Sequence, residues 1–173
     1  MVDSLRVLSI FGTRPEAIKM APVVAALQRC PEQITALTCA TAQHRELLDQ
    51  VLGLFGIVPD VDLDVMRPGQ TPSQVAARIL LELEPVLQQL HPDWVLVQGD
   101  TTTVLAAALA AHYLRIRVGH VEAGLRTGDR WNPFPEESNR VLTDHVSDLC
   151  FAPTVQAQAN LLSEGIPFNR ILI

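Results

Sequence analysis

Short apolar segments alternate with longer segments of helical periodicity along most of the chain. The predicted strands are residues 5–11, 34–40, 94–98, 116–121, 149–152 and 170–173. The predicted helices are residues 13–29, 45–55, 71–90, 101–113, 136–145 and 154–164. Strands that alternate with helices are typical of βαβ units. The sequence therefore predicts an α/β fold, with a Rossmann-like, doubly wound and mostly parallel sheet and right-handed crossovers.

Composition narrows the class of protein further. The length of 173 residues suits one domain with a sizeable core. The net charge of −6 argues against nucleic acid or an anionic membrane surface as a partner. The three cysteines show no CxxC spacing, which indicates reduced thiols. No apolar run approaches the ~18–20 residues of a membrane helix, and no signal peptide is recognisable, so we expect a cytoplasmic protein without a membrane partner.

The longest polar segment follows the predicted strand 116–121 and extends to Pro135. So long a segment without regular structure usually binds a ligand or takes part in catalysis. The shorter segments after Phe11 and after Gln98 also leave carboxyl ends of predicted strands. Ligands of doubly wound sheets bind at that edge. We therefore expect the three segments to form one site for a phosphate-bearing sugar.

Basic residues stand at the first of these strand ends. Thr13 and Glu16 match a capping box that opens a helix. Free N–H groups at such a helix start favour an anion, Arg14 adds donors that match phosphate oxygens, and Lys19 lies one turn further along. The alternative is that Glu16 only caps the helix and that Arg14 and Lys19 are solvated surface charges.

Carboxylates stand at the other two strand ends. Asp100 follows strand 94–98, Glu122 follows strand 116–121, and Glu136 and Glu137 begin the next helix. Neighbouring carboxylates have pKa values that are pushed apart, which would supply one base and one acid. Each also has a simpler interpretation, since Asp100 could be an N-cap and the glutamates could be favoured by the helix dipole.

His120 is expected to share one face of its strand with Glu122, because strand side chains alternate. A lone histidine here is more typical of a hydrogen-bonded structural residue than of a catalyst. Metal ligation by His120 with Glu122 or Asp100 lacks a supporting HxxxH or DxD-type motif. The sequence also lacks a Walker loop and a GxGxxG fingerprint. We therefore predict no metal and no cofactor.

These motifs resemble the non-hydrolysing UDP-N-acetylglucosamine 2-epimerases. The matching segments are residues 11–22, 41–52, 67–70, 98–103 and 119–140, and the likeness extends through the spacers. The resemblance implies one half of a GT-B-type fold with two Rossmann-like domains. Residues 1–173 would be the N-terminal domain, without the C-terminal nucleotide-binding domain. It also implies a homodimer in the full-length form.

The resemblance further implies reversible conversion of UDP-GlcNAc to UDP-ManNAc at C2, by elimination of UDP to 2-acetamidoglucal and re-addition. Asp100, Glu122 and Glu136 match the acid/base carboxylates of the family, without showing which one takes the C2 proton. Arg14 and Lys19 match its substrate-contacting residues, as Asp100 and Glu122 also do. Bacterial members are similar in having a regulatory UDP-GlcNAc site, to which four matched positions would contribute: Gln43, His44, Arg67 and Gln70.

Two other functions fit the same residues. A glycosyltransferase-like domain would share the sheet architecture and would transfer sugar to an acceptor. A non-catalytic module would bind a sugar nucleotide without turnover. A hydrolysing epimerase, which releases free ManNAc and UDP, is a variant of the first hypothesis.

Overall fold

The computed structural model describes residues 4–41, 45–65, 67 and 69–173, with residues 45 and 46 described by their backbone alone. The described strands are β1 (Leu5–Phe11), β2 (Ile34–Ala40), β3 (Val61–Asp62), β4 (Trp94–Gln98), β5 (Arg117–Val121), β6 (Leu149–Phe151) and β7 (Ile171–Leu172). They form one sheet in the order β3-β2-β1-β4-β5-β6-β7, and every pairing is parallel. The prediction of a doubly wound parallel sheet is confirmed.

Helices connect successive strands. They are α1 (Arg14–Gln28), α2 (Arg45–Phe55), α3 (Pro72–Leu90), α4 (Thr102–Tyr113), α5 (Glu136–Val146) and α6 (Val155–Ser163), followed by a 3₁₀ turn at Phe168–Arg170. The capping box of α1 forms as predicted, with Thr13 at the N-cap and Glu16 at N3. The helix α3 has a second capping box, made by Thr71 and Gln74. The loop between β5 and α5, residues 122–135, contains no helix or strand.

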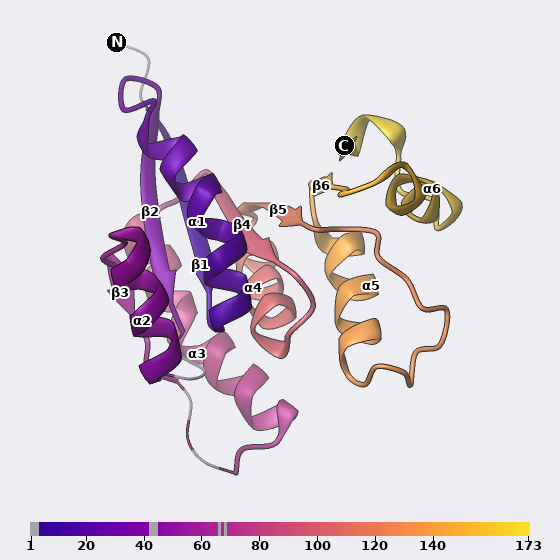
Figure 1. The fold of residues 1–173 in the computed structure, drawn as a ribbon, viewed down its shortest axis with the longest axis horizontal. Coiled ribbons are helices and arrows are strands. Elements are labelled where there is room, and N and C mark those ends of the chain that lie inside the picture. Colours follow the sequence, from indigo (N-terminus) through magenta and orange to yellow (C-terminus); the bar gives the residue numbers. More distant parts are fainter. Residues whose placement is uncertain (1–3, 42–44, 66, 68) are drawn as a thin grey trace.

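The strand order reverses between β1 and β4, and the helices divide between the two faces accordingly. On one face, Val7 and Phe11 of β1 pack with buried residues of α1 and α2. On the other face, Leu8 and Ile10 pack with α3 and α4. Figure 1 shows α1 and α2 in front of the strands and α4 behind them. A reversal of this kind leaves a crevice at the carboxyl ends of the two strands, which is where such folds bind ligands.

The predicted elements differ from the observed ones mainly at their ends. The strand expected over 170–173 is shorter, because its first residue belongs to the 3₁₀ turn. The short strand β3 pairs with β2 through only two residues. Among the described residues, each helix is too short or too polar to span a lipid bilayer.

The three cysteines differ in their burial. Cys39 and Cys150 are buried, and burial raises the pKa of each thiol to about 12, whereas Cys30 is exposed. The thiolate is the reactive form. We therefore expect a disulfide reagent such as DTNB at pH 8 to modify one thiol of the folded chain quickly, and all three after denaturation. Rapid reaction of two or three thiols in the folded chain would contradict these positions.

Candidate active site

A crevice of about 470 Å³ lies at the predicted place, between the carboxyl ends of β1, β4 and β5. Its described lining includes the first turn of α1, the turn after β4 and the turn after β5. Charged side chains from all three segments line it: Glu16, Lys19, Asp100 and Glu122. Three of the five residues predicted for catalysis or substrate binding therefore meet in one crevice.

Glu16 does more than cap α1. One carboxylate oxygen accepts hydrogen bonds from the N–H groups of Gly12 and Thr13, at 2.6 and 3.0 Å. The other oxygen accepts a hydrogen bond from the hydroxyl of Thr101, at 2.7 Å. Burial raises the pKa of Glu16, and these hydrogen bonds oppose the shift. Glu16 thus joins the turn after β1 to the turn after β4.

Glu122 pairs with Lys19 across the crevice. The Lys19 Nζ donates to both carboxylate oxygens, at 2.8 and 2.6 Å. The side-chain amide of Gln98 also donates to Glu122. The backbone φ of Glu122 is +69°. The structure therefore pairs Lys19 with a carboxylate of the chain, whereas the sequence predicts a contact with an anionic substrate.

Asp100 is held by α5. The Arg140 guanidinium donates to its carboxylate at 2.6 Å, and the Asn139 side chain donates to its backbone carbonyl at 2.9 Å. The N-cap of α4 is Thr101, whose hydroxyl accepts from the N–H of Val104. The simpler interpretation of Asp100 as the helix cap is therefore wrong, and its carboxylate remains at the crevice.

The other predicted residues lie apart from the crevice lining. Arg14 is exposed at the start of α1, and Glu136 is half-buried at the start of α5. Neither is among the described residues that line the crevice. Glu137 is buried instead, and its carboxylate accepts from the N–H groups of Thr127 and Gly128, at 3.0 and 3.1 Å. Glu137 therefore fixes the long loop.

The expectation that His120 and Glu122 share a face is not met by their contacts. His120 is fully buried and lies between the Asp144 carboxylate and the Gly99 carbonyl. Glu122 comes after the last residue of β5 and has a positive φ, so strand alternation no longer applies to it. The interpretation of His120 as a hydrogen-bonded structural residue is confirmed. Among the described residues, no cluster of three or more His, Cys, Asp or Glu could hold a metal ion.

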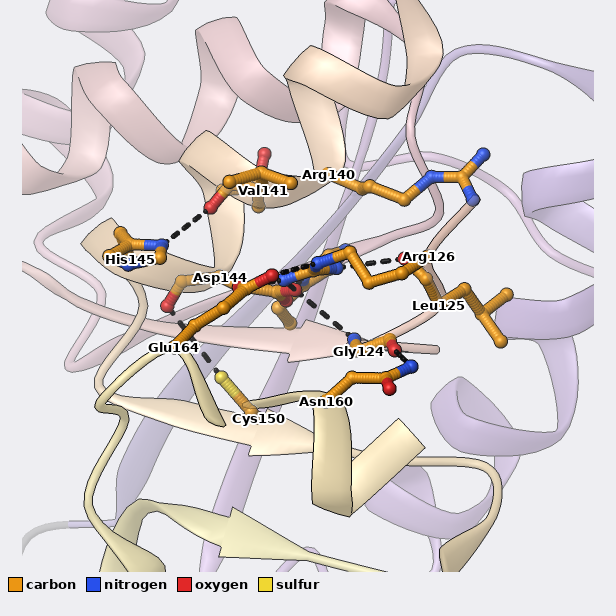
Figure 2. Close-up of polar contacts among 12 residues, drawn as sticks. Gly124, Leu125, Arg126, Arg140, Val141, Asp144, His145, Cys150, Asn160 and Glu164 are labelled. Atoms are coloured by element: carbon orange, nitrogen blue, oxygen red, sulfur yellow. Dashed lines mark hydrogen bonds and ion pairs between the residues drawn. The ribbon is translucent and has the colours of Figure 1, made fainter. Parts of the chain in front are cut away.

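Asp144 of α5 is a buried carboxylate behind the site, and Figure 2 shows its contacts with Gly124 and Arg126. Burial alone would raise the pKa of Asp144. The hydrogen bonds and charges of His120 and Arg126 outweigh it and hold the pKa below the ordinary 3.8. Arg126 in turn donates to both oxygens of Glu164, at 2.7 and 2.6 Å, and these acidic partners raise the pKa of its guanidinium.

The lowered pKa of Asp144 predicts part of the acid sensitivity of the fold. An acid whose folded pKa lies below its unfolded pKa stabilises the fold at higher pH, and this stabilisation is lost as pH falls through the folded value. As pH falls below about 4, we expect the free energy of unfolding to fall more steeply in the unsubstituted chain than in Asp144→Asn. Urea denaturation at a series of pH values measures both slopes, and equal slopes would contradict the prediction.

The positions predicted for a regulatory site are only partly described. Gln43 and His44 lie outside the described residues. Arg67 and Gln70 lie together, since the Gln70 side-chain oxygen accepts from the N–H of Arg67 at 2.6 Å. Both line a shallow pocket of about 450 Å³ with Gln74 and Arg78. The structure thus brings two of the four residues together.

Several site residues were not predicted from the sequence. Arg140, Gln98 and Asn139 contact the two crevice carboxylates or their turns, and Asp144 lies behind them. A local signal existed only for Arg140, which follows Glu136 and Glu137 at helical spacing on one face of α5. The others contact residues far away in the sequence, which no local pattern indicates.

Comparison with known proteins shows the family of this chain. The sequence profile described as UDP-N-acetylglucosamine 2-epimerase matches residues 25–173. The chain belongs to the UDP-N-acetylglucosamine 2-epimerase family. The epimerase of Salmonella typhimurium is 59% identical over 169 residues, which cover 98% of this chain and 45% of that protein. This chain thus spans less than half the length of such epimerases.

Solved structures of the epimerase family share the fold. The UDP-GlcNAc 2-epimerase of Neisseria meningitidis, crystallised with UDP-GlcNAc, is 53% identical, with a TM-score of 0.95 over 98% of this chain and 45% of that one. MurG of Acinetobacter baumannii is 16% identical, with a TM-score of 0.64 over 98% of this chain and 44% of its own. The second likeness concerns the fold alone, which is one half of a GT-B-type architecture.

Proposed function

We propose that this chain is the N-terminal half of a non-hydrolysing UDP-GlcNAc 2-epimerase, which interconverts UDP-GlcNAc and UDP-ManNAc. One observation carries the proposal: Asp100 and Glu122 face the same crevice, and each is held by a cation from another element, Arg140 or Lys19. Family membership and the UDP-GlcNAc bound to the Neisseria meningitidis relative support this choice of substrate.

The crevice has the groups that elimination and re-addition of UDP require. Removal of the C2 proton needs a positioned carboxylate base, and Asp100 and Glu122 are the candidates that line the crevice. Glu136 lies outside the lining and stays a candidate only through its match to the family motif. The departing diphosphate needs positive charge in place. In our proposal Lys19, which pairs with Glu122 in the free chain, turns to the diphosphate when substrate binds, and Arg14 assists it. Glu122 is then available to the sugar.

The intermediate, 2-acetamidoglucal, must be held away from water until UDP adds again. The crevice of this chain is open, and the relatives are more than twice as long as the segment that matches. We therefore assign closure of the site, and much of the grip on UDP, to a second domain. We also propose that the full-length protein forms a homodimer. Arg67 and Gln70, with Gln43 and His44, would contribute to a regulatory UDP-GlcNAc site.

The test uses this chain fused to the part of the Salmonella typhimurium relative that lies beyond the matched segment. Chromatography of products after incubation with UDP-GlcNAc should show UDP-ManNAc. Free ManNAc with UDP would indicate a hydrolysing epimerase instead. Transfer of sugar to an added acceptor, without UDP-ManNAc, would indicate the glycosyltransferase alternative.

Titration of the same fusion with UDP-GlcNAc addresses the remaining alternative, a module that binds without turnover. A fusion that is folded and binds UDP-GlcNAc but forms no product would favour a non-catalytic binding module and overturn the epimerase proposal. The unmodified Salmonella typhimurium relative, assayed in parallel, confirms that the assay detects epimerisation.

A further inference from the structure

We propose that Asp144 is a positioning residue that fixes the turns carrying Asp100 and Glu122 relative to each other. Asp144 lies on α5, is fully buried and is outside the crevice lining. The inference rests on the proposed function, because it concerns the carboxylates assigned to acid/base chemistry there. Asp144 would connect the turn that carries Asp100 to the turn that carries Glu122.

The first connection runs through His120. The Nδ1 of the ring lies 2.5 Å from one oxygen of Asp144, and the Nε2 lies 2.7 Å from the carbonyl oxygen of Gly99. Each ring nitrogen thus lies within hydrogen-bond distance of an oxygen, and the ring bridges Asp144 and Gly99. Gly99 directly precedes Asp100 and has a φ of +87°. The orientation of the peptide group that leads into Asp100 is thus set by His120, whose ring is oriented by Asp144.

The second connection is direct. The other oxygen of Asp144 accepts the N–H of Gly124 at 3.1 Å and the Arg126 guanidinium at 2.7 Å. Gly124 is two residues after Glu122, in the same turn. Its carbonyl oxygen accepts from the Asn160 side chain at 2.9 Å. Figure 2 shows Gly124 between Asp144 and Asn160. These two hydrogen bonds hold the backbone of the turn that carries Glu122.

One buried carboxylate therefore has one oxygen connected to each turn. If both hydrogen bonds are weakened together, Asp100 and Glu122 can shift independently of one another. A displacement of about 1 Å at a reacting group can lower a rate by about 100-fold. A role confined to stability would instead lower the amount of folded protein and leave the turnover of the folded molecules unchanged.

The variant Asp144→Asn tests this inference, because it keeps the shape of the side chain and replaces one acceptor oxygen by a donor NH₂. The matched control is Asp148→Asn. Asp148 also accepts a backbone N–H, that of Val118 at 2.8 Å, but at the opposite end of β5. Both variants are made in the fusion for kinetics and in the 173-residue chain for ¹⁵N–¹H correlation spectra.

We expect Asp144→Asn to lower kcat about 10- to 100-fold while KM changes less than about 3-fold. The amide resonances of Asp100 and Glu122 should shift as well. Asp148→Asn should change neither kcat nor these two resonances. The proposal is overturned if Asp144→Asn keeps kcat within about twofold, lowers it no more than the control does, or shifts only resonances of α5.

If Asp144→Asn does not fold, His120→Gln tests the first connection alone. It leaves the hydrogen bonds of Asp144 with Gly124 and Arg126 in place. A lowered kcat with shifted Gly99 and Asp100 resonances would support the inference, and unchanged values would overturn it. An inactive but folded fusion without substitutions would count against the proposed function. In that case the resonance shifts in the 173-residue chain still decide whether Asp144 positions the two turns.

Discussion

Replacement of Asp100 by Asn is expected to lower the rate of epimerisation by at least about 100-fold, while the fold remains intact. The carboxylate lies at the crevice, and the amide that replaces it cannot take or give a proton at neutral pH. General acid–base groups contribute about 10²- to 10⁴-fold to rates. The measurement is kcat of the fusion with UDP-GlcNAc, together with a circular dichroism melting curve.

Asp93→Asn is the matched control for this prediction. The Asp93 carboxylate accepts the N–H of Arg6 at 2.8 Å and precedes β4, whereas Asp100 follows the carboxyl end of the same strand. The control should retain full activity. Activity of Asp100→Asn close to that of the control would remove Asp100 from the catalytic assignment.

Replacement of Gly124 by Ala is expected to cost about 2–5 kcal/mol of unfolding free energy. Two effects add at this position. The φ of +83° is unfavourable for any residue with a Cβ, and the new Cβ would lie 2.4 Å from the carbonyl oxygen of Ala157, which belongs to the backbone of α6. A backbone atom cannot turn away as a flexible side chain can.

Gly128→Ala separates these two effects. Gly128 has a similar φ of +80°, but an added Cβ there would meet no atom within 4 Å. Its substitution should cost only the conformational part, about 1–2 kcal/mol. Urea denaturation of the two variants gives the difference between them. Equal losses would show that the turn after β5 does not lie against α6 as described.

The order of strands and helices could be predicted from the sequence because it depends on local patterns. The run 5–11 is a buried strand by composition alone, and Thr13 with Glu16 marks the start of the next helix within four residues. The carboxyl edge of a parallel sheet then places Asp100 and Glu122 near each other. The strand order was therefore sufficient to predict that these two carboxylates lie close together.

The partners of the site residues could not be predicted in the same way. Lys19 and Glu122 are 103 positions apart in the sequence, and Arg140 and Asp100 are 40 apart. Such pairs depend on the twist of the sheet and on the angle at which each helix crosses it, and neither leaves a periodic signal. Without the resemblance, which favours Glu136, the choice between Glu136 and Glu137 was likewise open, because a helix start favours both. Only the structure shows that Glu137 turns inward to the long loop.

The most direct test of the account is proton NMR of the fusion with UDP-GlcNAc in D₂O, following the C2 proton of the sugar. We predict that UDP-ManNAc appears with deuterium at C2, because a carboxylate of the crevice removes the original proton and solvent supplies its replacement. A folded fusion that binds UDP-GlcNAc and yields UDP-ManNAc with the C2 proton fully retained, or yields no UDP-ManNAc, would contradict it.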